Sequence, residues 1–106
     1  MTTTSSASPV TMVPESIVRL VARLGTEPSV RRVILFGSRG RGDAGPRADV
    51  DLAVEAPSAS ARDWLRLVEM VEDAETLLPI DLVRVEEAPA ELLERIRAEG
   101  RTLLER

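Results

Sequence analysis

The middle of the chain combines a candidate phosphate-binding turn with a pair of carboxylates. Gly37-Ser38 closes the apolar run 33–36, and Asp49 and Asp51 follow after ten intervening residues, inside a second apolar run. A glycine after a strand allows a sharp bend and a close approach of a ligand, and unpaired backbone N–H groups in such a turn suit a phosphate. Two carboxylates two residues apart on a strand share one face and can hold a divalent cation. The pattern predicts a site for a metal–nucleotide complex.

Three more kinds of side chain extend this predicted site. The Ser38 hydroxyl can hydrogen-bond a phosphate, and Arg39 and Arg41 lie close enough in the sequence to add guanidinium groups. Asp81 is an isolated acid in the apolar stretch 77–83, on the next expected strand. If the two strands are neighbours, Asp81 faces the same cleft as Asp51. Three converging carboxylates repel one another unless a cation such as Mg²⁺ compensates their charge.

Each part of the pattern also has a simpler explanation. A glycine-rich turn after a strand is most often only a turn, and this one matches neither the dinucleotide-binding fingerprint nor the P-loop. The three aspartates could instead lie on a solvated face of a sheet. Glu55 is interpreted as surface, and Trp64 as part of the core. A solvated face is also the interpretation for five later acids, Glu86, Glu87, Glu91, Glu94 and Glu99.

The composition excludes several classes of mechanism. The chain has 106 residues, 18 acids against 14 basic residues that are all arginine, and no His, Cys, Lys, Tyr, Asn or Gln. Without His or Cys, imidazole bases, thiolate nucleophiles, disulfides and thiolate zinc sites are excluded. A metal ion must therefore be held by oxygen, which favours hard cations. The missing cysteines agree with a cytoplasmic location.

The same composition speaks against two kinds of partner. A net charge of −4 and only two aromatic residues give no basic patch or set of stacking platforms, so direct nucleic-acid binding is not expected. No apolar run approaches the roughly 20 residues of a membrane span. Residues 1–13 are rich in Thr, Ser and Ala and lack a secretory signal pattern, so we expect a disordered tail there.

Hydrophobic periodicity predicts one α/β (α+β) domain over residues 14–106, a small mixed sheet flanked by helices. The helix expected after Ser60, whose side chain suggests a capping box with Asp63, runs until Pro79 breaks it. A short edge strand is expected at the C-terminal end. The expected elements are helix 14–24, strand 30–36, a short helix start at 38–42, strand 48–56, helix 61–78, strand 80–85, helix 89–99 and strand 101–106.

The combined motif resembles the DNA polymerase β-like nucleotidyltransferase superfamily. Gly37-Ser38, a gap of ten residues, Asp49-x-Asp51 and the later Asp81 fit its pattern, and the chain looks most like the minimal nucleotidyltransferases (MNT or MntA-type proteins) over residues 14–104. Two positions depart from the family: Gly40 replaces a common Ala, and Ala48 a common Ser or Thr. Neither removes a ligand, although Gly40 is expected to loosen the short helix by roughly 1 kcal/mol relative to Ala.

The resemblance implies a reaction and a role for each site residue. AMP would pass from ATP to an acceptor hydroxyl with release of pyrophosphate, assisted by two Mg²⁺ ions. Asp49 and Asp51 would hold both ions, and Asp81 would hold the catalytic ion and help to deprotonate the acceptor. Gly37 and Ser38 would grip the outer phosphates.

The resemblance also implies a partner. Minimal nucleotidyltransferases commonly pair with a HEPN-domain RNase toxin in type VII-like toxin–antitoxin systems, and some AMPylate a tyrosine of that toxin. This chain has neither the His of a HEPN site nor a Tyr, so the acceptor would lie in another molecule. Two alternatives stay open: an antitoxin that neutralises its partner by contact alone, and a nucleotidyltransferase for a small molecule. Oligomeric state, base preference and acceptor residue are also open.

Overall fold

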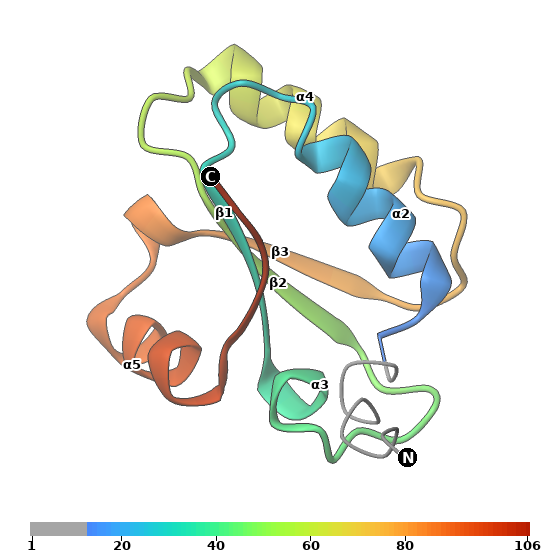
Figure 1. Ribbon diagram of the computed structural model, residues 1–106. Helices are drawn as coiled ribbons and strands as arrows, with labels where there is room; N and C mark the ends of the chain where they lie inside the picture. The colour runs from blue at the N-terminus through green and yellow to red at the C-terminus, as the bar shows by residue number, and fades with distance from the viewer. Residues whose placement is uncertain (1–12) are drawn as a thin grey trace, which may run out of the picture.

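The computed structural model describes residues 13–106, so the tail expected at residues 1–13 lies outside the described residues except for Val13. Val13 is half-buried against the core. The predicted α/β class is confirmed (Figure 1). The elements are α2 (Glu15–Leu24), β1 (Arg32–Phe36), α3 (Gly37–Arg41), β2 (Val50–Glu55), α4 (Ala61–Glu72), β3 (Ile80–Arg84), the 3₁₀ turn η2 (Val85–Glu87), α5 (Ala90–Glu99) and β4 (Arg101–Glu105).

Four strands form one mixed sheet in the order β3-β2-β1-β4. β1 is antiparallel to β2 and to β4, whereas β2 and β3 are parallel. The two acid-bearing strands are neighbours, which is the condition on which the placement of Asp81 depended, and the expected C-terminal edge strand is confirmed. Because β1 ends where β2 and β3 begin, the turn after β1 and the first residues of the other two strands meet at one end of the sheet.

Helices cover both faces of the sheet. α2 and α4 lie on one face and α5 lies on the other (Figure 1). The larger core, under α2 and α4, includes the helix residues Ile17, Leu20, Leu24 and Leu67, with Trp64 packed against it as predicted. The smaller core, under α5, consists of Ile34, Phe36, Ala53 and Ile96. Ala53 shares the strand face of Asp51, so this face is covered by α5 and is not simply solvated.

The helix boundaries follow local signals, with one exception. Ser60 and Asp63 form the expected capping box, with reciprocal bonds of 3.0 and 3.1 Å between side chain and backbone N–H. The prediction that α4 continues to Pro79 is wrong, because the helix ends at Glu72. Pro79 disfavours a helical residue before it, and the Thr76 hydroxyl accepts the N–H of Leu78 at 3.2 Å, so a local turn replaces the helical bonds.

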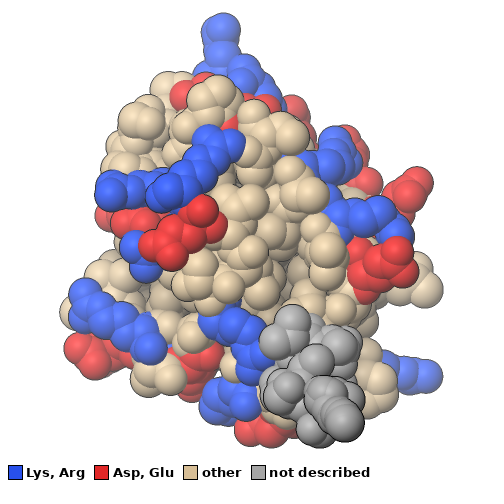
Figure 2. Space-filling model, in the orientation of Figure 1, with Lys and Arg blue, Asp and Glu red and all other residues tan. Residues whose placement is uncertain are grey.

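Several charged side chains form ion pairs at the surface. Arginines lie beside acids on the face shown in Figure 2. Among the pairs of the fold, Arg66 contacts Glu27 at 3.0 Å. Glu55 pairs with Arg32 at 3.2 Å and is half-buried, so interpreting it as plain surface was wrong in part. No helix within residues 13–106 has the length and apolar character that a membrane crossing requires.

Candidate active site

Gly37 makes the turn that starts the site. Phe36 is extended, and Gly37 then adopts φ +70°, in the left-handed region that favours glycine. A Cβ on Gly37 would overlap the carboxylate of Asp51. The glycine is therefore required both by the backbone conformation and by the close approach of the acid. The sharp bend expected here is present, and it places the turn directly beside the first strand carboxylate.

The short helix α3 continues this turn and packs against the end of α5. The Ser38 carbonyl accepts the N–H groups of Gly42 and Asp43 at 2.9 and 3.0 Å, and Gly42 ends the helix with φ +88°. A Cβ on Gly40 would lie 2.6 Å from the Glu99 carbonyl oxygen and 2.7 Å from that of Leu35. The expectation that Gly40 merely loosens the helix was wrong, since this glycine allows two backbones to approach.

Three aspartates meet at the same end of the sheet. Asp49 immediately precedes β2, and Asp51 and Asp81 occupy paired positions on the parallel strands β2 and β3. Paired positions of neighbouring strands direct their side chains to the same face. Asp51 is also the partner of Phe36 on β1, the residue before Gly37. The structure thus brings together the turn and the acids that the sequence separated by up to 44 positions (Gly37 to Asp81).

The acids are electrostatically coupled. Burial raises the pKa of Asp51 above its ordinary value, and the negative charges of Asp81 and Asp49 raise this pKa further. The positive charge of Arg95 opposes the shift. Asp49 and Asp81 are exposed, while Asp51 is half-buried. A cation at this place would relieve the repulsion that raises the pKa.

The donor set fits a hard cation bound together with a phosphate ligand. Within residues 13–106, no three acids lie close enough together to hold a metal ion by themselves. Mg²⁺ usually takes only one or two protein carboxylates and completes its shell with water and substrate phosphates. Oxygen ligands, mutual repulsion of the acids and an adjacent glycine turn agree with that mode of binding. Asp49, Asp51 and Asp81 are the candidate ligands, of which one or two would contact any one ion.

The two arginines expected at the phosphates make bonds within the protein. Arg39 donates to the carbonyl of Ala48 at 3.0 Å and to that of Pro46 at 3.2 Å. It therefore holds the loop that leads to Asp49. Arg41 pairs with Asp43 at 3.2 Å and with Glu99 at 3.1 Å. Both guanidinium groups therefore bond to protein groups beside the site, the loop before Asp49 in one case and two acids in the other.

Two residues of α5 belong to the site although the sequence interpretation missed them. Glu99 Oε1 accepts the backbone N–H of Gly37 at 3.1 Å, so the interpretation of Glu99 as a solvated acid was wrong. Arg95 lies 5.9 Å from the centre of the Phe36 ring and 3.6 Å from Glu99. One signal was present: Leu92, Ile96 and Glu99 follow helical spacing on the inward stripe.

Of the other late acids, Glu87, Glu91 and Glu94 are exposed as expected, whereas Glu86 accepts the N–H of Ala56 at 3.1 Å.

Comparison with known proteins decides the family. The model of the family described as Polymerase beta, Nucleotidyltransferase matches residues 19–106. The chain belongs to this nucleotidyltransferase family. The match confirms the resemblance drawn from the Gly-Ser turn and the three aspartates, together with the corresponding fold. A search of curated proteins found no match.

Solved structures share the nucleotidyltransferase fold. A toxin–antitoxin with AMP-PNP matches with TM-score 0.66 and 22% identity, over 87% of this chain and 73% of that chain. The complex of a tri-AMPylated HEPN toxin with an MNT antitoxin from Shewanella oneidensis matches with TM-score 0.54 and 22% identity, over 87% and 69%. A protein from Sulfolobus solfataricus described as a nucleotidyltransferase matches with TM-score 0.60 and 19% identity, over 100% and 93%.

Proposed function

We propose that this nucleotidyltransferase transfers AMP from ATP to a hydroxyl group, tyrosine by preference, of a HEPN-type toxin, and thereby acts as the antitoxin of that toxin. The observation that carries the proposal is the pairing of Asp51 with Asp81 directly beside the Gly37 turn. Family membership supports the class of reaction. The structural neighbours with AMP-PNP and with an AMPylated HEPN toxin support the nucleotide and the partner.

Each site residue has a role in this proposal. Asp49, Asp51 and Asp81 would hold Mg²⁺, which would supply positive charge to neutralise the phosphates of the nucleotide. The Gly37 N–H and the Ser38 hydroxyl bind the outer phosphates, and Arg41 adds positive charge there. Arg39, through the carbonyls of Ala48 and Pro46, keeps the loop before Asp49 in position.

The reaction breaks one phosphoanhydride bond and forms one phosphoester bond. The acceptor oxygen attacks the α-phosphorus of ATP, and pyrophosphate leaves with the electron pair of the broken bond. The proton of the acceptor hydroxyl passes to the Asp81 carboxylate and from there to solvent. Asp81 is exposed, so a hydroxyl carried by a second protein can reach it. Because the chain contains no Tyr, a tyrosine acceptor must come from such a partner.

One observation favours a second function, neutralisation by contact alone. The Gly37 N–H is already bonded to Glu99. An antitoxin that only covers its toxin would not require this N–H to be free. The two functions differ in whether the toxin becomes covalently modified.

A labelling experiment tests the proposal. The protein is incubated with ATP labelled at the α-phosphate, Mg²⁺ and a purified HEPN protein encoded beside it. We expect label on the HEPN protein, loss of that label with EDTA, and loss in Asp49→Asn and Asp51→Asn. Asp73→Asn, at the end of α4, is the matched control and should transfer normally. An unlabelled but inhibited HEPN protein, inhibited equally by both site variants, would establish neutralisation by contact.

A further inference from the structure

The carboxylate of Glu99 lies among three donors that converge on it from different elements. Gly37 donates its backbone N–H at 3.1 Å from the turn after β1. Arg41 of α3 approaches the other oxygen at 3.1 Å, and Arg95 of α5 lies at 3.6 Å. We call this group of donors, Gly37 N–H, Arg41 and Arg95, the Glu99 seat. Two guanidinium groups and a backbone N–H thus surround one anion, and Arg41 also pairs with Asp43 at 3.2 Å.

The donors of the Glu99 seat suit a phosphate better than a carboxylate. Guanidinium groups bind phosphate oxygens in bidentate fashion, and backbone N–H groups beside a glycine bind phosphate as well. A diphosphate carries more negative charge than a single carboxylate and offers more acceptor oxygens. It can therefore offer each donor an oxygen of its own, whereas the Gly37 N–H and Arg95 share Oε1 of Glu99.

The seat borders the aspartates. The Gly37 position is in contact range of the Asp51 carboxylate, and the charge of Arg95 acts on the pKa of Asp51. An anion that replaced the Glu99 carboxylate would therefore lie next to the acids that would hold Mg²⁺. Carboxylate-bound Mg²⁺ usually also binds substrate phosphates. Of the three phosphates of a nucleoside triphosphate, the β- and γ-phosphates lie farthest from the sugar and leave together as pyrophosphate.

We infer that the Glu99 seat binds the β,γ-diphosphate of the nucleotide, that Arg95 is one of its ligands, and that Glu99 occupies the seat until nucleotide displaces it. The inference rests on the proposed function, because it assigns the leaving group of that reaction. Glu99 is the last residue of α5 and precedes Gly100, and the displacement requires its side chain to change rotamer. Arg41 and Arg95 are half-exposed, with 44% and 55% of their side chains accessible, and both can follow an incoming phosphate.

Displacement of an internal anion has a consequence for selectivity. Ligands with a β,γ-diphosphate recover the interactions that Glu99 gives up, whereas AMP has no β- or γ-phosphate to replace them. Removing the charge of Glu99 should therefore favour ATP and pyrophosphate without favouring AMP. Removing the charge of Arg95 should weaken the same two ligands and leave AMP unchanged.

Calorimetric binding to the full chain tests the inference. The ligands are pyrophosphate, a non-transferable ATP analogue and AMP, each with Mg²⁺. In Glu99→Gln the side-chain oxygen still accepts the Gly37 N–H, so the fold is retained while the charge is lost. We expect Glu99→Gln to bind pyrophosphate and the ATP analogue roughly fivefold more tightly, as the loss of one competing negative charge implies. We expect Arg95→Gln to bind both about tenfold more weakly, the effect of one charged hydrogen bond.

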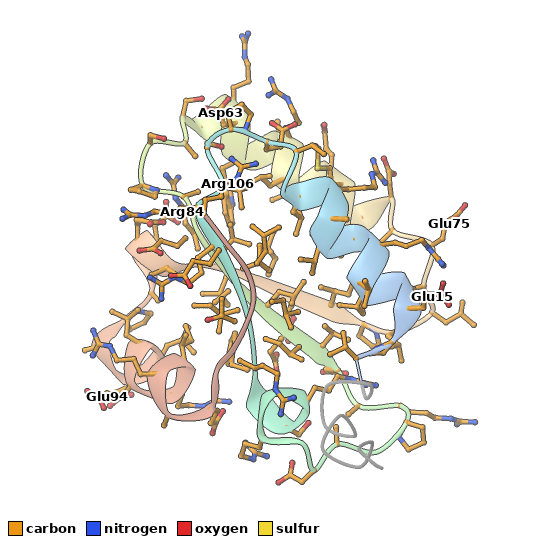
Figure 3. All side chains as sticks on the ribbon, viewed as in Figure 1. Glu15, Asp63, Glu75, Arg84, Glu94 and Arg106 are labelled. Carbon is orange, nitrogen blue, oxygen red and sulfur yellow. The ribbon has the colours of Figure 1, made fainter. Side chains whose placement is uncertain are left out.

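A second pair on the same helix supplies the controls. Glu94 and Arg97 form an ion pair at 3.8 Å, and Glu94 lies on the outer side of α5 (Figure 3). Glu94→Gln and Arg97→Gln change the net charge equally and should leave all three affinities unchanged. Thermal melts of all four variants detect a loss of fold, which would lower the affinity for AMP together with that for the other ligands.

The outcomes separate the inference from the proposed function. Three outcomes would overturn the inference. The substitutions could change the affinities for AMP and pyrophosphate equally, or they could have the same effects as the control pair. The third is that neither the wild type nor Glu99→Gln binds pyrophosphate at all. The expected affinities without AMP transfer to the HEPN protein would leave the inference standing and refute the proposed function. If AMP transfer to the HEPN protein depends on Asp51 while ligand binding is unchanged in the Glu99 and Arg95 variants, the proposed function stands and the inference is refuted.

Discussion

Replacing Gly37 by alanine is expected to strain the backbone and displace Asp51 at the same time. Gly37 has φ +70°, and a left-handed conformation costs a non-glycine residue about 1–2 kcal/mol. The new Cβ would also overlap the Asp51 carboxylate, and overpacking of this kind adds about 1–3 kcal/mol. The total loss in the free energy of unfolding is therefore about 2–5 kcal/mol. Asp51 must also rotate away, so AMP transfer should be lost.

Gly42 separates the two contributions. It has φ +88°, but a Cβ added there would meet nothing within 4 Å. Gly42→Ala should therefore cost only the backbone term of about 1–2 kcal/mol. The gain from restricting the unfolded chain is common to both substitutions and cancels in their difference. The excess cost of Gly37→Ala over Gly42→Ala then measures the overlap with Asp51.

A double-mutant cycle checks this attribution. Urea denaturation followed by circular dichroism gives the unfolding free energies of Gly37→Ala, Asp51→Ala and the double variant. Once the carboxylate is absent, Gly37→Ala should destabilise no more than Gly42→Ala does. Equal losses for Gly37→Ala and Gly42→Ala in the wild-type background, or an unchanged loss in the Asp51→Ala background, would refute the close approach on which the site is built.

Two further predictions concern the charge and the packing of the site. Burial and neighbouring acids raise the pKa of Asp51 in the folded state. Above that raised pKa the ionised carboxylate destabilises the folded protein. The penalty disappears once the pH falls below the pKa of an unfolded Asp, about 4. Asp51→Asn removes the ionised carboxylate, so it should raise the melting temperature in EDTA at pH 7 but not at about pH 3. An equal rise at both pH values would contradict the prediction. Gly40→Ala should destabilise by about 1–3 kcal/mol, since the Cβ would meet the backbone oxygens of Glu99 and Leu35. Gly45→Ala, which meets nothing within 4 Å, should stay within about 0.5 kcal/mol in the same urea titrations, and equal losses would refute the clash.

Most elements were predictable because their signals are local. The stripe in α2, the capping box of Ser60 and Asp63, and the glycine after β1 each depend on residues a few positions apart. The end of α4 was not predictable from periodicity alone, since Ala74 and Leu78 continue the apolar stripe after the helix has ended. Both residues still pack against the core, so burial without helical bonds explains the misleading pattern.

The sequence by itself determined the chemistry that this protein can use. Oxygen is the available metal ligand, imidazole and thiolate are absent, and a tyrosine acceptor must belong to another molecule. The same residues also indicated the Gly-Ser turn and the acids of a nucleotidyltransferase. These conclusions follow from side-chain chemistry and short-range spacing, which a linear sequence contains directly.

Only the tertiary structure decided which groups meet. The parallel pairing of β2 with β3 places Asp81 beside Asp51, and the return of α5 over the sheet brings Glu99 to the N–H of Gly37, 62 positions earlier in the chain. A glutamate on an exposed helix and a glutamate that occupies an anion site look alike in a sequence. Their difference arises from the surrounding charges and donors, and the path of the folded chain supplies these.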